Sequence, residues 1–462
     1  MKIVVCVRRG LDGEINPFDA CAYEAALRIP EAQITLLSMG PADVGDFLLR
    51  LTRLGTAEAV LLCDKAFAGA DTLATAYALS LAVRRLEPQV VFCGRQTLVG
   101  DTAQTGAMLS RMLGYGLITN VMSIDSVSEE GIVCSTRCEG EASAKLPALV
   151  TVERINTLRL PRLRSRLGTL TVWSAADIGA DVSRCGLAGS PTRVLKTFEN
   201  ESGKRRCCFI PKEKLGFAIS EGLRRSSERA GAPERGSELL DKVCIVGDAP
   251  RSFAETVSDN IIVLPLSDAE TIAASIKELE PSAVLWGSDT ASKRLAAQVA
   301  AELSLGLCAD CTSLECKDGQ LIMYRPALSG SIIAKIKSLT VPAMATVRTQ
   351  SDSREEVIVT AGFGASGCMD RVRKFASSLG AQLCATRKLV DNDFAPYEAQ
   401  VGLTGKTVSP PVYITVGVSG AVHHIVGMQR SGTVIAIDPD KNAPIFDYAD
   451  FGIVDNFENI EF

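Results

Sequence analysis

The sequence contains an internal repeat, which limits the chain to folds that can be built twice. Residues 87–94 read EPQVVFCG and residues 280–287 read EPSAVLWG. Each stretch follows a helix-like segment and precedes a polar loop and a second helix-like segment. Each copy later ends on a similar strand, LPALVTVER from Leu146 and VPAMATVRT from Val341. The alternative is a chance likeness between two buried strands, but two copies of one α/β unit explain more of the pattern.

Short apolar runs alternate with helix-length amphipathic segments along the whole chain. Examples are KIVVCV, QITLLSM, AVLLC, QVVFCG and ALVTV. This alternation predicts mostly parallel sheets covered by helices. Two polar stretches, residues 226–238 (SSERAGAPERGSE) and 351–356 (SDSREE), have the composition of linkers. With 462 residues and about 150 residues per domain, we expect roughly three domains.

Composition excludes several classes of protein. The net charge of −5, from 49 Lys and Arg against 54 Asp and Glu, argues against a general nucleic-acid binder. The two histidines, His423 and His424, are adjacent, so sites built from several histidines are excluded. Fifteen cysteines spread along the chain indicate a reducing cytosol or an anaerobe. The chain start does not resemble a signal peptide and no apolar run could span a membrane, so we expect a cytoplasmic protein.

The last third of the chain carries glycines at three predicted strand-to-helix corners. GFGASG (362–367) lies between a strand and a helix-like segment, which is the context of a dinucleotide fingerprint. The acidic residue expected about 20 positions later is missing, since the next strand ends in Thr386 and Arg387, and this disfavours ordinary NAD binding. GLTGKT lies in an irregular segment (391–411), and VYITVGVSG leads into AVHHIVGM. Together these corners predict one cofactor site at the carboxyl edge of a parallel sheet, rather than glycine-rich turns without a ligand.

These residues resemble a known family. TRKLVD, PYEAQVGLTGKTVSP, VYITVGVSGAVHHIVGM and VIAIDPDKNAPIFDYADFGIV are similar to the FAD domain of the electron transfer flavoprotein α subunit. INPFDACAYEAALRI, GRQTLVGDTAQTGAML and LPALVTVERINTLRLP are similar to the β subunit of the same flavoprotein. The resemblance implies a natural fusion of a β subunit with an α subunit. Its fold would be α/β, with two similar parallel-sheet, nucleotide-binding-like domains and a C-terminal Rossmann-like FAD-binding domain.

The domains that the resemblance implies are 1–228 (β-like), 229–240 (linker), 241–355 (first α domain) and 356–462 (FAD-binding). The last domain is expected to swivel between a donor-facing and an acceptor-facing position. Residues implied to contact FAD are Thr386, Arg387, Gly402, Thr404, Gly405, Lys406, Ser419, Gly420, Ala421, Val422, His423, His424, Asp438 and Asn456. Among them, Arg387 is expected by the isoalloxazine ring, Thr404 at flavin N5 and His424 at the C2 carbonyl. Phe363 departs from the family, which has an arginine there.

The first domain is implied to hold AMP, or a second FAD. The residues concerned are Cys6, Asp71, Thr72, Asp101, Thr102, Gln104, Thr105 and Gly106. GDTAQTG is typical of a loop whose Asp and Thr cap a helix while the helix amides face a phosphate. A plain capping loop is the alternative. The segment between Val7 and Ile15 is shorter than in typical β subunits, so part of the pocket is expected to be absent.

The implied function is electron transfer on FAD, rather than an enzyme reaction on a substrate of its own. The donor would be an acyl-CoA dehydrogenase or another flavin dehydrogenase, in fatty-acid β-oxidation or anaerobic metabolism. The acceptor would be a quinone oxidoreductase, a ferredoxin or a flavodoxin. One alternative is an electron-bifurcating form with a second FAD and NADH as donor; another is a non-redox nucleotide-binding protein that has lost flavin. We expect no catalytic or metal-binding residues, and a homodimer is compatible with the sequence.

Overall fold

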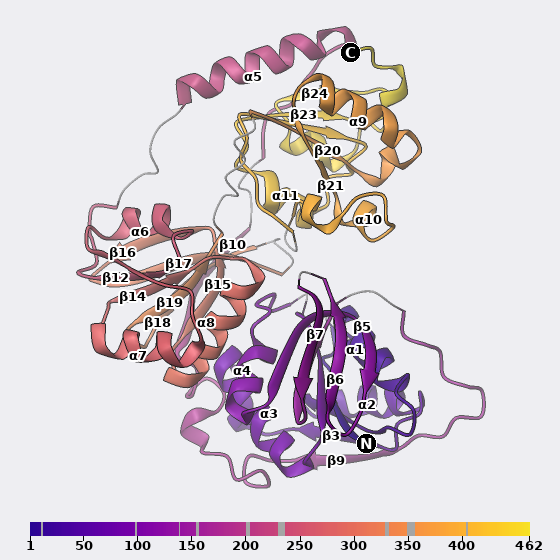
Figure 1. The fold of residues 1–462 in the computed structure, drawn as a ribbon, viewed down its shortest axis with the longest axis vertical. Coiled ribbons are helices and arrows are strands. Elements are labelled where there is room, and N and C mark those ends of the chain that lie inside the picture. Colours follow the sequence, from indigo (N-terminus) through magenta and orange to yellow (C-terminus); the bar gives the residue numbers. More distant parts are fainter. Residues whose placement is uncertain are drawn as a thin grey trace. The chain divides into compact units, whose positions relative to one another are not determined.

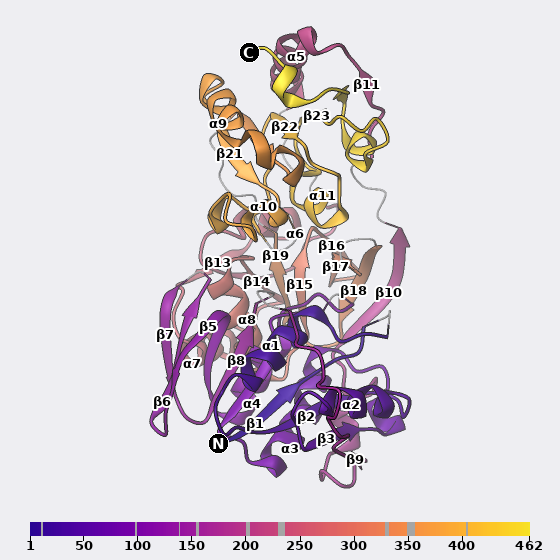
Figure 2. The ribbon, with the colours of Figure 1, turned by 90° about the vertical axis from the view of Figure 1, so that its right-hand side faces the viewer.

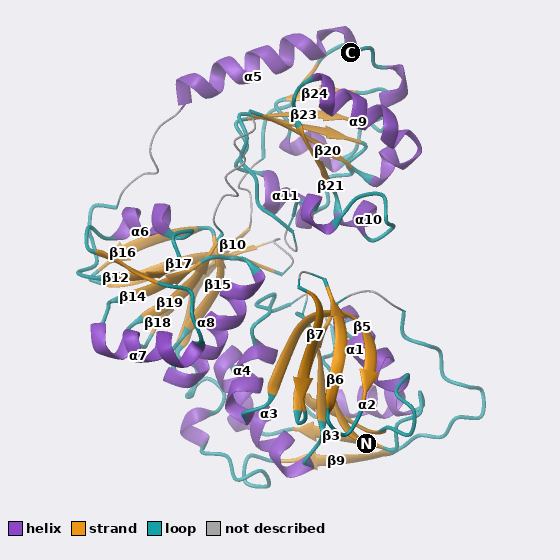
Figure 3. Cartoon of the chain, in the orientation of Figure 1, coloured by secondary structure: helices purple, strands orange, loops and turns teal. Residues whose placement is uncertain are grey.

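A computed structural model describes residues 1–10, 13–97, 99–137, 139–153, 157–199, 204–229, 236–328, 332–348, 356–402 and 405–462. The chain forms two compact units. Unit 1 comprises Met1–Thr197, Arg235–Leu328 and Ala334–Val347, and unit 2 comprises Phe198–Glu234, Ser329–Ile333 and Arg348–Phe462. Figure 1 colours the elements along the sequence, and Figure 3 shows helices and strands alternating in both units, as predicted. No helix among the described residues is long and apolar enough to cross a membrane.

The first half of unit 1 is a nine-stranded sheet in the order β7-β6-β5-β8-β4-β1-β2-β3-β9. Its strands are β1 (Lys2–Cys6), β2 (Gln33–Met39), β3 (Glu58–Leu62), β4 (Val90–Gly94), β5 (Gly116–Val127), β6 (Gly131–Thr136), β7 (Gly140–Lys145), β8 (Ala148–Val152) and β9 (Thr169–Trp173). The pairing is parallel except at β5–β6 and β6–β7. The helices are α1 (Pro17–Leu27), α2 (Val44–Thr52), α3 (Thr72–Leu86) and α4 (Thr105–Leu113). Helices α1 and α2 pack on one face and α3 and α4 on the other, so the central parallel strands are buried on both faces.

The second half of unit 1 contains two sheets. The parallel sheet has the order β13-β12-β14-β19-β15, and the other has the order β10-β18-β17-β16. The strands are β10 (Thr192–Glu199), β12 (Val243–Val246), β13 (Ile261–Leu264), β14 (Ala283–Trp286), β15 (Leu307–Cys311), β16 (Ser313–Lys317), β17 (Gln320–Ala327), β18 (Ile332–Ser338) and β19 (Ala343–Val347). The helices are α6 (Arg251–Val257), α7 (Ala269–Leu279) and α8 (Thr290–Leu303).

The predicted duplication is confirmed by strand order and by local backbone geometry. The order β5-β8-β4-β1-β2 in the first half corresponds to β15-β19-β14-β12-β13 in the second. Asn120 on β5 and Asp310 on β15 both have a left-handed backbone, with φ of 57° and 55°. Both backbone N–H groups donate to a threonine on the neighbouring strand, Thr151 at 3.2 Å and Thr346 at 2.8 Å. The two halves therefore share one irregular detail that strand packing alone does not require.

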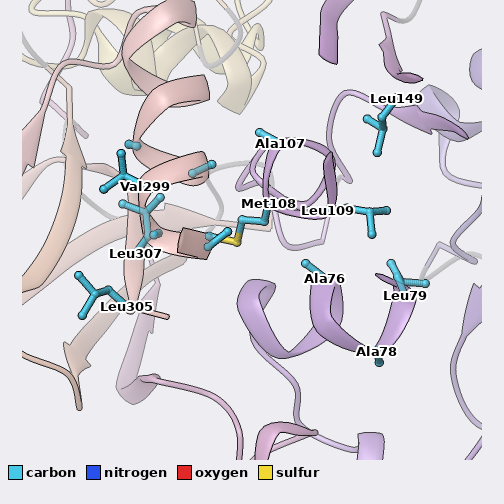
Figure 4. Close-up of a cluster of buried hydrophobic side chains, with 14 of the residues drawn as sticks. Ala76, Ala78, Leu79, Ala107, Met108, Leu109, Leu149, Val299, Leu305 and Leu307 are labelled. Carbon is cyan, nitrogen blue, oxygen red and sulfur yellow. The ribbon is translucent and has the colours of Figure 1, made fainter. Parts of the chain in front are cut away.

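The two halves of unit 1 share a hydrophobic core. Figure 4 shows Met108 of α4 reaching toward Val299 of α8 and Leu307 of β15, with Ala76 and Leu79 of α3 on the other side. All five side chains are buried. At the rim, the guanidinium of Arg111 contacts carboxylates of α7 and α8 at 3.0 and 2.8 Å. Burial of this apolar surface, rather than the exposed ion pairs, stabilises the association of the two halves.

Unit 2 is built on a parallel sheet in the order β11-β24-β23-β22-β20-β21 (Figure 2). Its strands are β11 (Cys208–Phe209), β20 (Val357–Ala361), β21 (Gln382–Ala385), β22 (Val412–Val416), β23 (Thr433–Ile437) and β24 (Phe451–Ile453). Its helices are α5 (Leu215–Arg229), α9 (Met369–Ser378), α10 (Arg387–Val390) and α11 (Val422–Met428). Helices α5 and α9 cover one face, and α11 covers the other.

Residues Phe198–Glu234, which precede the second copy of the repeat, are part of unit 2. Strand β11 extends the sheet, and Leu215 and Ala218 of α5 are buried against it. The Arg205 guanidinium donates to the carbonyls of Gly432 and Ser431 at 2.8 and 2.5 Å, near the C-terminal end of α11, and pairs with Asp450. Residues 230–235 of the predicted linker and residues 349–355 before the last domain lie outside the described residues, so the three-domain division stays a prediction.

Candidate functional site

The strand order of unit 2 identifies where a ligand would bind. From β20 the chain passes to β21 on one side of the sheet, and β22, β23 and β24 follow on the other side. In open parallel sheets, ligands bind outside the carboxyl ends of the strands at the point where this order reverses. That point lies between β20 and β22. The corners after these two strands carry Gly362–Gly367 and Gly417–Gly420.

The first glycines of the predicted fingerprint allow two corners to touch. Gly362 N donates to Val416 O at 2.8 Å, and Gly364 N donates to Gly417 O at 3.1 Å. A Cβ atom on Gly362 would lie 2.0 Å from Gly417 O. A Cβ on Gly367 would meet nothing within 4 Å. The motif therefore serves backbone packing at its start and leaves open space at its end, beside the start of α9.

Most of the predicted FAD residues that the structure describes follow β21, β22, β23 and β24, at this same carboxyl edge. Thr386 is the N-cap of α10 and makes no side-chain capping hydrogen bond, and the Arg387 guanidinium contacts Asp391 Oδ2 at 3.1 Å. After β23, Asp438 Oδ1 accepts the Asp440 amide at 2.9 Å, and burial raises the pKa of Asp438. The remaining edge residues with exposed or half-exposed side chains are Ser419, Ala421, Val422, His423 and Asn456.

Residues 400–402 and 405–406, the described part of the loop of residues 400–406, adjoin this edge. Gly402 N donates to Lys406 O at 3.1 Å, and Lys406 N donates to Gln400 O at 2.8 Å. Val401 N donates to Ala385 O at 3.0 Å, which ties the loop to the end of β21. Thr404, expected at flavin N5, lies outside the described residues. Gly405, another predicted contact, donates from its N–H to Gly402 O at 3.1 Å.

The Lys406 ammonium lies beside a buried thiol. Burial raises the pKa of Cys384, and the adjacent Lys406 charge opposes that rise. Cys384 is fully buried at the end of β21. The Lys406 charge therefore acts on Cys384 in this structure, and a contact between Lys406 and flavin stays a prediction.

The same loop packs against α11 backbone to backbone. A Cβ on Gly427 would lie 2.4 Å from Gly402 N, and a Cβ on Gly402 would lie 2.7 Å from His423 O. Gly402 has a φ of +141°. Glycine at both positions permits this approach, and Val408 N then donates to Gly427 O at 2.8 Å.

His424 is buried in α11 with both ring nitrogens facing protein atoms. Nδ1 lies 3.1 Å from Val401 O, and Nε2 lies 3.2 Å from the Tyr413 hydroxyl. Thr360 Oγ1 in turn donates to the Tyr413 oxygen at 2.6 Å. Burial lowers the pKa of His424 to about 4, so the ring is neutral at pH 7. A hydrogen bond from His424 to the flavin C2 carbonyl stays a prediction.

Sequence reasoning missed Tyr413, which is fully buried on β22. Its one signal was a tyrosine hydroxyl in the strand VYITV, whose other hydroxyl belongs to Thr415. A buried Tyr hydroxyl needs a hydrogen-bond partner, but the sequence does not say which residue supplies it.

The polar groups at this edge are of the kinds that FAD requires. Open space at Gly367 lies near the start of α9, where helix amides attract a pyrophosphate. Arg387 supplies a cation, and Ser419 and Asn456 supply exposed polar side chains on separate corners. These are the kinds of groups that a dinucleotide needs at several points along its length.

Unit 1 has a corresponding reversal point between β1 and β4, and a carboxylate lies there. Asp19 of α1 is buried, with Oδ2 accepting Arg8 N at 2.8 Å and Oδ1 accepting Gly94 N at 3.2 Å. Burial raises the pKa of Asp19 to about 7. A Cβ on Gly94 would lie 2.3 Å from Asp19 Oδ1, so glycine is required there. Sequence reasoning did not identify Asp19.

Two predicted nucleotide residues of unit 1 have structural partners. Asp71 caps α3 by accepting Leu73 N at 3.0 Å, and its second oxygen accepts the Thr192 hydroxyl at 2.7 Å. Cys6, at the end of β1, is in register with Cys93 of β4. Thr72 begins α3 directly after Asp71.

The loop before α4 contains a buried amide without a partner. The Gln104 side chain is 1% exposed, and neither its oxygen nor its nitrogen has a hydrogen bond within the part of the chain that the structure describes. Arg325 of β17 donates to Gly100 O at 3.1 Å and to Asp101 O at 2.9 Å. Asp101 has a φ of 52°. Thr102 lies in the same loop, and Thr105 and Gly106 begin α4.

The loop of residues 157–168 exposes leucines beside arginines. Leu160 and Leu163 are 88% and 100% exposed. The base of the loop is anchored, because Arg159 Nη2 contacts Glu24 Oε1 at 2.9 Å. Arg162 and Arg164 are exposed in the same stretch.

Comparisons with known proteins give matches over most of the chain. The model of the electron transfer flavoprotein domain matches residues 3–178 and 257–361, and the electron transfer flavoprotein FAD-binding domain matches residues 353–429. The chain is 41% identical over 223 residues to protein FixA of Azorhizobium caulinodans, covering 44% of this chain and 79% of the relative. It is 36% identical over 230 residues to the electron transfer flavoprotein β subunit of Clostridium acetobutylicum, covering 46% and 88%. It is 34% identical over 232 residues to the α subunit of Thermoanaerobacterium thermosaccharolyticum, covering 40% and 70%.

Proposed function

The chain belongs to the electron transfer flavoprotein family, and we propose that it carries electrons on one FAD at the carboxyl edge of the unit 2 sheet. The observation that carries this proposal is that most of the predicted FAD residues that the structure describes follow β21, β22, β23 and β24, at the carboxyl edge that includes the reversal point between β20 and β22. The match of residues 353–429 to an FAD-binding domain supports the same cofactor.

The protein groups at this edge would bind and orient FAD, whose isoalloxazine ring supplies the redox chemistry when bound. Arg387 would place positive charge near the ring, where it favours added negative charge. Ser419 and Asn456 would fix other parts of the cofactor by hydrogen bonds. The loop of residues 400–406 would cover the ring from one side, since it is held between β21 and α11.

We further propose that the exposed loop of residues 157–168 docks a flavin dehydrogenase, such as an acyl-CoA dehydrogenase. Exposed Leu163 offers an apolar anchor, and neighbouring arginines would complement an acidic surface. Electrons would pass on to a quinone oxidoreductase, a ferredoxin or a flavodoxin in the cytoplasm.

A second nucleotide, AMP or FAD, is proposed at the loop before α4 in unit 1. The partnerless Gln104 amide favours a ligand over a plain capping loop, because buried amides without hydrogen bonds are costly. If this nucleotide is FAD, the protein is of the bifurcating form, with NADH as donor.

The FAD proposal is tested by the flavin-to-chain ratio of the purified full chain. One FAD supports the simple carrier, two support the bifurcating form, and none would overturn the proposed function. Bleaching of the flavin absorbance by NADH alone distinguishes the second form from the first.

We expect Gln104→Leu to raise the stability of the chain without nucleotide and to weaken nucleotide binding. Without nucleotide, the variant should be more stable than the wild type by about 1–3 kcal/mol, because a buried amide without a partner is removed. Binding of AMP or FAD to unit 1 should weaken at the same time. Calorimetric titration with AMP and urea unfolding measure the two effects, and a variant that loses stability without nucleotide would contradict the assignment.

A further inference from the structure

We propose that Lys388 is a cation that binds the pyrophosphate group of the dinucleotide in unit 2, and that the aromatic ring of Phe363 holds its ammonium in place. The inference rests on the proposed function, because the ligand is the FAD proposed at this carboxyl edge. Lys388 is not among the residues that the resemblance implies to contact FAD.

Two neighbouring strand ends bring this lysine and this ring together. Ala361 at the end of β20 is in register with Ala385 at the end of β21, and Thr386 N donates to Ala361 O at 2.9 Å. Phe363 follows the first strand and Lys388 follows the second. The Lys388 ammonium lies 4.1 Å from the centroid of the Phe363 ring. Because a cation within about 6 Å of an aromatic face is attracted by the ring quadrupole, the ring holds the lysine charge at this edge.

The backbone on both sides of the pair is fixed, while the two side chains are exposed. The glycines that flank Phe363 donate from their backbone N–H groups to the carbonyls of Val416 and Gly417, at 2.8 and 3.1 Å. In α10, Leu389 directly after Lys388 is fully buried. Phe363 is nevertheless 38% exposed, and Lys388 is exposed as well. The lysine and the ring therefore reach solvent from a rigid part of the reversal point, where a ligand can meet them.

The Lys388 charge is available to an anion. Among the residues that the structure describes, no carboxylate pairs with Lys388, whereas the neighbouring Arg387 contacts Asp391 Oδ2 at 3.1 Å. An aromatic ring has no net charge, so it holds the ammonium without neutralising it and leaves N–H donors for a ligand. A Cβ on Gly367, in the same corner as Phe363, would meet nothing within 4 Å. The pyrophosphate is the anionic part of FAD, and it belongs at the reversal point of such a sheet.

Removal of the charge alone tests the role of Lys388. Lys388→Met keeps an unbranched side chain that can still lie over the ring, and Lys388→Arg keeps the charge. With the full chain freed of flavin, we expect Lys388→Met to weaken FAD binding about tenfold at low salt, the effect of one lost charge-assisted hydrogen bond. Lys388→Arg should stay within about threefold of the wild type. The loss in Lys388→Met should shrink as salt is raised, because salt screens an exposed charge.

Lys374→Met is the matched control, because Lys374 is an exposed lysine of α9 that plays no part in this proposal. Its FAD affinity should equal that of the wild type. If Lys388→Met binds FAD as tightly as Lys374→Met does at low salt, the inference is wrong.

A double-variant comparison tests the positioning role of the ring. Phe363→Leu removes the aromatic face but keeps an apolar side chain. It should weaken FAD binding about threefold when Lys388 is present and not at all in the Lys388→Met background, because the ring acts through the lysine. An equal loss in both backgrounds, or no loss in either, would overturn the role given to Phe363.

Chemical modification tests the anion site without depending on FAD. The full chain without flavin is treated with a lysine-acetylating reagent, with and without inorganic pyrophosphate, and mass spectrometry compares Lys388 with Lys374 in the same molecules. We expect pyrophosphate to slow the acetylation of Lys388 about threefold or more and to leave Lys374 unchanged. Equal slowing at both lysines, or none at either, would overturn the inference. If the wild type binds no FAD, the proposed function fails, and protection by pyrophosphate still decides the role of Lys388.

Discussion

Gly427→Ala is expected to abolish tight flavin retention and to destabilise unit 2 by roughly 3 kcal/mol. Alanine is the better helix former by about 1 kcal/mol, so an isolated helix would gain stability. In this fold, however, the new methyl group would lie 2.4 Å from Gly402 N and 2.6 Å from Gly402 Cα. Backbone atoms cannot yield as a flexible side chain does, so the loop of residues 400–406 must move away from α11.

Gly216→Ala is the matched control, because Gly216 lies in α5 and a Cβ there meets nothing within 4 Å. This variant should keep flavin and be as stable as the wild type or slightly more stable. Flavin content after gel filtration and urea unfolding measure both variants. If Gly427→Ala retains flavin as well as Gly216→Ala does, the backbone contact does not position the site.

Lowering the pH from 7 to 4 is expected to destabilise unit 2 by about 3 kcal/mol through the shifted pKa of His424 alone. Burial lowers the pKa of this histidine from 6.5 to about 4. The unfolded chain therefore takes up the proton first as the pH falls. The stabilisation is complete above pH 6.5 and is lost progressively as the pH approaches the folded-state pKa.

Carboxylates of the protein also titrate in this range. The prediction therefore concerns the difference in the free energy of unfolding between variants. The stability difference between wild type and His424→Asn should change by about 3 kcal/mol from pH 7 to pH 4. Hydrogen exchange of amides in β22 follows unit 2 specifically. His423→Asn, at the exposed neighbouring position, should keep the wild-type dependence. An unchanged difference at His424 would show that the ring is not buried as a neutral group.

The sequence predicted the α/β class and the duplication because both follow from periodic apolar runs. EPQVVFCG and EPSAVLWG became β4 and β14, at equivalent places in their sheets. The carboxyl-edge site was also predictable, since a glycine between a strand and a helix marks a corner, and corners after parallel strands meet at one edge. Resemblance to the family, rather than periodicity, supplied the individual FAD residues.

Buried polar partners were not predictable. Asp19 reads as an ordinary acidic residue in the first turn of a helix, yet its carboxylate accepts amides from two separate strand ends. Arg205 reads as part of a basic stretch, yet it bonds carbonyls more than two hundred residues later in the chain. Such pairings depend on tertiary contacts, which a local pattern does not encode.

The FAD content of the full chain shows whether this protein holds flavin. The chain is purified, mixed with excess FAD, passed through gel filtration and denatured to release the flavin for measurement. We expect at least one FAD per chain for the wild type and for Gly216→Ala, and loss of FAD in Gly427→Ala. A wild-type chain that elutes folded but without flavin would contradict the claim that the unit 2 edge holds FAD for electron transfer.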